Sequence, residues 1–148
     1  MGDCTYRFLE SEEALSDFLE CFERGTWPKP DWNHAAHIAV AGCYLSSYSH
    51  EEAADRARRG IRHYNQRTGT INGDHSGYHE TLTLFWLAVV KAWMCNFASG
   101  TTRIDAVRML VAKFAPQRDL FREYYTFDVL QSVEARRSWV PPDVKPLP

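Results

Sequence analysis

The sequence lacks a long apolar run, a signal for export and closely spaced cysteines. Its longest uninterrupted apolar stretch, residues 84–90, ends at Lys91 and is far too short to cross a bilayer. Charged residues interrupt the first ten positions, so no cleavable signal sequence is visible. The four cysteines form no Cys-x-x-Cys metal or redox motif. These absences predict a soluble cytoplasmic protein with free thiols and no membrane partner.

Neither sign of charge dominates, since the formal net charge is −2. This balance excludes a general attraction to nucleic acid or to anionic membranes. An arginine cluster between residues 56 and 67 has no known docking motif for nucleic acid, and we interpret it as a solvated helix face. The sequence also lacks the Gly-x-Ser-x-Gly motif, the phosphate loop and the dinucleotide fingerprint. No nucleic-acid partner and no serine nucleophile are therefore expected.

The residues that are present predict one all-α domain covering 1–148. Apolar residues make up 45% of the 148 residues, which is enough for a substantial core. Apolar periodicity and capping residues indicate a bundle of about six helices with an extended, proline-rich C-terminal tail. The predicted helices lie between Ser11 and Gly25, over 34–47, between Ser49 and Gly69, over 77–98, between Thr101 or Thr102 and Pro116, and over 126–137.

Two of these helices, 34–47 and 77–98, are apolar almost all round and are predicted to lie at the centre. Each of them begins with polar residues. Because the links on either side of the intervening helix are short, the two central helices should run parallel, with their N-termini at one end of the bundle. That end would collect five of the six histidines, together with Glu80, Asp74 and Tyr64, and it would lie near Arg118.

The residues at this end suggest a metal-dependent enzyme that acts on a small molecule. His34 and His37 are three residues apart and can share a helix face. With His79 they would supply three nitrogen ligands to a divalent metal such as zinc, leaving an open fourth position. Glu80 is the predicted general base or fourth ligand, and Tyr64 is a candidate proton donor.

Other interpretations of the same residues stay open. A buried histidine often bonds to a backbone carbonyl, and Glu80 suits an N-terminal cap. Two parallel helix N-termini create a positive end that would accept a carboxylate or a phosphate. The competing function is therefore a non-catalytic helical module that binds a small acidic ligand or a partner protein. The arginine-rich helix and the tail would also allow a homodimer.

The pattern Trp32-Asn33-His34-x-x-His37, followed by Tyr78-His79-Glu80-Thr81-Leu82-Thr83, resembles a group of small, uncharacterised, all-helical bacterial proteins. The resemblance extends to the tail, 139–143, and implies no activity. The chain is more loosely similar to the DinB-like metal-binding four-helix bundles, which hold a divalent metal with three histidines. The late His-x-x-x-His pair usual in that family is absent, and the paired histidines come early instead.

Overall fold

A computed structural model describes residues 6–148 of the chain. Within this range the protein is all-helical, which confirms the predicted fold class. The six α-helices are α1 (Glu12–Arg24), α2 (His34–Ser47), α3 (His50–Thr68), α4 (Glu80–Met94), α5 (Arg103–Phe114) and α6 (Val133–Arg137). Short 3₁₀ turns are η1 (Arg7–Leu9), η2 (Lys29–Asp31), η3 (Ala115–Gln117), η4 (Leu120–Glu123) and η5 (Val129–Gln131).

Local capping chemistry starts and stops most of the helices where the sequence predicted. The side chains of Ser11, Asn33 and Ser49 each accept a hydrogen bond from a backbone N–H three residues later. Gly25 and Gly69 end α1 and α3 with φ angles of 75° and 87°, a conformation that glycine adopts without strain.

Two predicted helices are shorter than expected, and the physical reasons are local. The fourth begins at Glu80 because Gly77 has a φ of 77° and His79 is the capping residue. It ends at Met94 instead of continuing to residue 98. In the sixth, Asp128 and Ser132 each cap a separate helical segment. Residues 126–137 therefore form η5 and then the short α6 instead of one helix. Residues 7–9 form η1, before α1.

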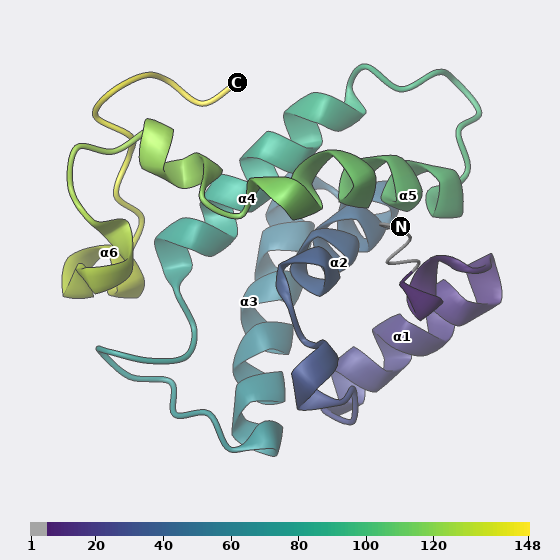
Figure 1. Ribbon diagram of the computed structural model, residues 1–148, viewed down its shortest axis with the longest axis horizontal. Helices are drawn as coiled ribbons and strands as arrows, with labels where there is room; N and C mark the ends of the chain where they lie inside the picture. Colours follow the sequence, from purple (N-terminus) through teal and green to yellow (C-terminus); the bar gives the residue numbers. More distant parts are fainter. Residues whose placement is uncertain (1–5) are drawn as a thin grey trace.

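Helix α2 lies at the centre, as its apolar composition predicted. Nearly all of its residues from Ala35 to Tyr44 are buried, and it packs against α3, α4 and, most extensively, α5. Gly42 permits the close crossing with α5, because a Cβ there would lie 2.9 Å from Leu110 Cδ1. In Figure 1, α1 lies on one side of this centre, and α6 with the C-terminal tail lies on the other.

The proline-rich tail is extended, as predicted, and it is attached to the body through Val140. Val140 N donates to Thr81 Oγ1 at 3.0 Å, and Tyr125 Oη donates to Val140 O at 2.8 Å. The hydroxyl of Thr81 donates to Ser138 O, outside its own helix. Thr83 does bond back to its own helix, at His79 O.

The cysteines within the described residues form no disulfide bonds. Cys21, Cys43 and Cys95 are free, and burial raises the pKa of the Cys43 thiol to about 12. Cys4 lies outside the described residues. No helix within residues 6–148 is both long and apolar enough to span a membrane.

Candidate functional site

The starts of α2 and α4 border the same cavity, as the chain topology predicted. This cavity, called here the α2–α4 cavity, has a volume of about 720 Å³. Its wall includes His34, His37 and His79, residues near the end of α3, and the segment that follows α5. Most of the remaining wall is apolar or aromatic, which is the usual lining of a site for a small organic molecule.

His37 has one ring nitrogen engaged and one free. Nδ1 donates to Asn33 O at 2.8 Å, so the lone pair of the neutral ring is on Nε2. Nε2 has no hydrogen-bond partner within residues 6–148. The ring lies against Trp32, with centroids 3.9 Å apart. Burial lowers the pKa of His37 to about 4, so the imidazole is neutral near pH 7 and can accept a hydrogen bond.

His34 is arranged in a similar way but with the opposite nitrogen engaged. Nε2 donates to Phe114 O at 3.0 Å, which leaves the lone pair on Nδ1. Its ring meets the edge of Trp86, with centroids 4.7 Å apart. Burial lowers the pKa of His34, the bond to Phe114 O partly offsets this, and the nearby positive charge of Arg118 lowers it further.

His79 has both ring nitrogens engaged inside the protein. Nε2 donates to Val129 O at 2.9 Å, and Nδ1 accepts the backbone N–H of Leu82 at 3.2 Å as the cap of α4. Burial lowers the pKa of His79, which favours this neutral form. A metal bound to either nitrogen would first have to replace one of these two hydrogen bonds.

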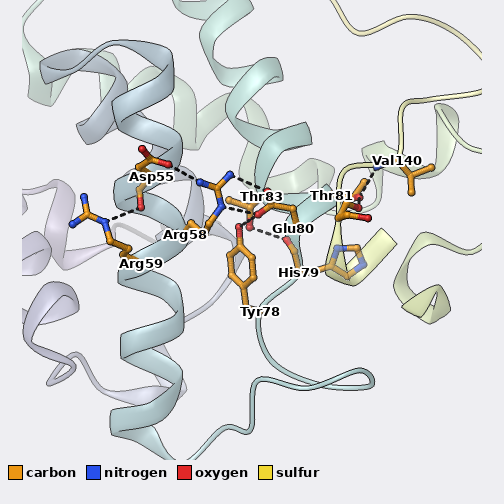
Figure 2. Close-up of polar contacts among 10 residues, drawn as sticks. Asp55, Arg58, Arg59, Tyr78, His79, Glu80, Thr81, Thr83 and Val140 are labelled. Carbon is orange, nitrogen blue, oxygen red and sulfur yellow. Dashed lines mark hydrogen bonds and ion pairs between the residues drawn. The ribbon is translucent and has the colours of Figure 1, made fainter. Parts of the chain in front are cut away.

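Glu80 is absent from the wall of the α2–α4 cavity and lies in a cluster with Arg58 and Tyr78 (Figure 2). Arg58 Nε and Nη2 each donate to one carboxylate oxygen at 2.9 Å, and Tyr78 Oη donates to Oε1 at 2.6 Å. Burial by itself raises the pKa of Glu80, but the bonds from Arg58 and Tyr78 outweigh it and lower the pKa overall. The carboxylate is therefore charged, paired and part of the α3–α4 contact.

Tyr64 is also absent from the cavity wall. Its hydroxyl donates to Trp27 O at 2.8 Å, and its buried ring packs against Phe22 and Trp32. The hydroxyl thereby anchors the connection between α1 and α2. Of the other polar residues predicted at this end, Asp74 pairs with Arg137, while His63 and His75 are exposed.

Trp86 and Trp32 both lie in the wall of the cavity. Tyr78, Arg118 and Arg122 also line the cavity. One signal was available for Arg118, since the topology put the end of α5 at this end of the bundle. The aromatic residues gave no such signal, because one face of an aromatic ring can pack in a core while the other borders a cavity.

Within 6–148 no group of three or more His, Cys, Asp or Glu side chains is placed to hold a metal ion. What the structure brings together is a cavity whose wall includes two histidines, each with one ring nitrogen unpartnered among the described residues, two indole rings and two guanidinium groups.

Comparisons with protein families, with curated proteins and with solved structures found no match to this chain.

Proposed function

We propose that this protein binds a small organic molecule in the α2–α4 cavity and that His37 Nε2 accepts a hydrogen bond from it. The observation that carries the proposal is the free lone pair of a neutral imidazole in the wall of a cavity of about 720 Å³. A buried or half-buried acceptor without a partner lowers stability, so a ligand hydroxyl or amine that donates to it gains affinity.

The size and lining of the cavity support a small-molecule ligand. Ligand cavities commonly measure about 300–1,000 Å³ and combine apolar walls with a few polar groups that set orientation. Leu82, Trp86 and Phe121 provide apolar surface, and Trp32 stacks on the histidine itself. A flat ligand that carries one donor group would use both kinds of surface.

A fragment screen by ¹⁵N NMR tests this proposal. Fragments that carry a hydroxyl or amine should shift the signals of His37 and of the Trp32 and Trp86 indoles. His37→Ala should weaken these fragments about tenfold, the usual value of one hydrogen bond. His63→Ala is the matched control, since His63 is an exposed histidine outside this cavity. Fragments that gather elsewhere, or that ignore His37→Ala, would contradict the proposal.

The metal-dependent enzyme predicted from the sequence is the second candidate. It is favoured by the lone pairs on His34 Nδ1 and His37 Nε2, which belong to residues three positions apart on α2. Elemental analysis of tag-free protein incubated with Zn²⁺ tests it. Stoichiometric zinc that is lost in both His34→Ala and His37→Ala would support a metal site, and the same zinc content in all three proteins would refute it.

A further inference from the structure

We propose that the ligand of the α2–α4 cavity is a small organic acid whose carboxylate pairs with Arg118. This inference rests on the proposed function, because it names the class of molecule that the same cavity would bind. It comes from a different observation, which is the distribution of charge in the wall.

The charged side chains in the cavity wall all come from one segment of the chain. Within residues 6–148, the charged groups that line the cavity are Arg118, Asp119 and Arg122, all from the segment after α5. Arg122 is paired, with Asp119 at 3.5 Å and Asp128 at 3.6 Å. Arg118 has no carboxylate within 4.0 Å among the described residues. Arg118 is therefore the charged group of the wall that has no ion pair among the described residues, and the carboxylate of a ligand would supply one.

The start of α2 adds to this positive potential. The first turns of α1, α3, α4 and α5 all contain an acidic residue, whereas that of α2 contains none. The partial positive charge at the N-terminus of α2 is thus not offset by its own first turn. Arg118 lies close enough to His34, the first residue of α2, for its charge to lower the pKa of that histidine, and the opposite effect of the Asp119 carboxylate is smaller. A carboxylate at Arg118 would be near both positive sources.

The wall also requires that the acid be bifunctional. His37 Nε2 accepts a hydrogen bond, and a carboxylate cannot donate one, so the two ends of the ligand must differ. Apolar side chains such as Leu82 and Phe121 line the same cavity and suit a hydrocarbon or aromatic body. The predicted ligand therefore has a hydroxyl or amine, an apolar body and one carboxylate.

A length series of matched acids and amides tests the inference. The acids are 4-hydroxybenzoate, 4-hydroxyphenylacetate and 3-(4-hydroxyphenyl)propionate, and each is compared with its own amide by calorimetry. The series varies the spacing between hydroxyl and carboxylate, and the amide removes the charge at nearly constant size while replacing one acceptor oxygen with an NH2 donor. We expect at least one acid to bind about fivefold to tenfold more tightly than its amide, a modest gain because Arg118 is exposed to solvent.

Variants separate the carboxylate contact from the rest of the cavity. Arg118→Gln should abolish the preference for the acid and leave the amide unchanged. Arg24→Gln is the control, because Arg24 is an exposed arginine on α1 outside the cavity. Raising the salt concentration should weaken only the acid.

Different binding results would contradict the acidic class of the ligand and the proposed function. Acids and amides that bind equally, and that both weaken in His37→Ala, would overturn the acidic class and retain the cavity as a binding site. If no acid or amide of the series binds the wild-type protein, the result counts against the proposed function as well. An acid preference that survives Arg118→Gln would also overturn the assignment of Arg118.

Discussion

The starts of α2 and α4 look alike in the sequence but differ in what their histidines do. Both are polar openings to apolar helices, and both border one cavity. At α4, His79 uses both ring nitrogens and Glu80 is bound by Arg58 and Tyr78. At α2, His34 and His37 each keep one ring nitrogen without a partner within residues 6–148. The polar groups at the start of α4 are therefore bound within the protein, and the start of α2 is the better candidate for binding a ligand.

The neighbours of each helix start explain the difference. Three segments close around α4, since Val129 accepts from His79, Arg136 donates to Gly77 O at 2.9 Å, and Arg58 holds Glu80. At α2, a carbonyl from the end of α5 reaches only one nitrogen of His34, and His37 bonds to its own helix cap. A histidine at a helix start is thus available to a ligand only where other segments leave it unsatisfied.

The largest effect should come from His79→Ala. This substitution removes the cap of α4 and leaves the carbonyl of the fully buried Val129 with only its longer bond from Ser132 N, at 3.3 Å. We expect a loss of about 3–4 kcal/mol in the free energy of unfolding, measured by urea denaturation. His37→Ala should lose only about 1 kcal/mol, because no protein partner is orphaned at its Nε2. Equal losses in the two variants would contradict the inference that the histidine at the start of α4 contributes more to stability than the histidine at the start of α2.

The pH dependence of stability tests the neutral state of His37. Its pKa is about 4 in the folded protein and 6.5 ordinarily, so between these values the unfolded chain binds a proton that the folded protein does not. Stability should therefore be full above pH 6.5 and fall toward pH 4, by about 3 kcal/mol from His37 alone. The pKa values of His34 and His79 are also lowered and act in the same direction.

His37→Gln isolates the contribution of His37 to this loss. The variant should retain more of its neutral-pH stability at pH 4.5 than the wild-type protein, as measured by thermal unfolding in parallel buffers. Identical pH profiles for the two proteins would show that His37 is not held neutral.

Arg58→Ala should have the next largest effect, because it leaves the Glu80 carboxylate without its bidentate partner. The side chain of Glu80 is 15% exposed, so its unpaired charge would be poorly solvated. We expect a loss of about 2–3 kcal/mol by urea denaturation, with binding in the α2–α4 cavity retained at temperatures where the variant is folded. Arg24→Ala, which breaks the exposed pair with Glu20, should cost less than about 0.5 kcal/mol.

Gly77→Ala and Gly69→Ala compare two glycines with positive φ. A Cβ at Gly77 would lie 2.5 Å from Ile71 O, whereas a Cβ at Gly69 would meet nothing within 4 Å. The backbone conformation penalises alanine at both positions by about 1 kcal/mol. Thermal unfolding should show a further loss of about 1 kcal/mol in Gly77→Ala alone, because the loop before α4 must move. Equal destabilisation would indicate that this loop is loosely packed.

The sequence predicted the elements whose causes are local. Ser11, Asn33 and Ser49 cap their helices through bonds to residues three positions away, so the local sequence was sufficient to predict where these helices begin. The short links between α2, α3 and α4 then required the parallel arrangement that brings both helix starts to one cavity. The extra length predicted for the fourth and sixth helices was wrong. Apolar periodicity does not reveal a glycine with positive φ, and it does not reveal a side-chain cap that begins a new helical segment.

By itself, the sequence determined the all-helical fold, the central place of α2 and the meeting of three histidines at one cavity. The tertiary structure decided which of those histidines has a nitrogen left for a ligand. The partner of His79 is Val129, 50 residues further on, and the partner of His34 is Phe114, 80 residues further on. Hydrogen bonds over such separations depend on how the segments after α5 fold back onto the helices. The local sequence at residues 34–37 and 77–83 does not determine how those segments fold.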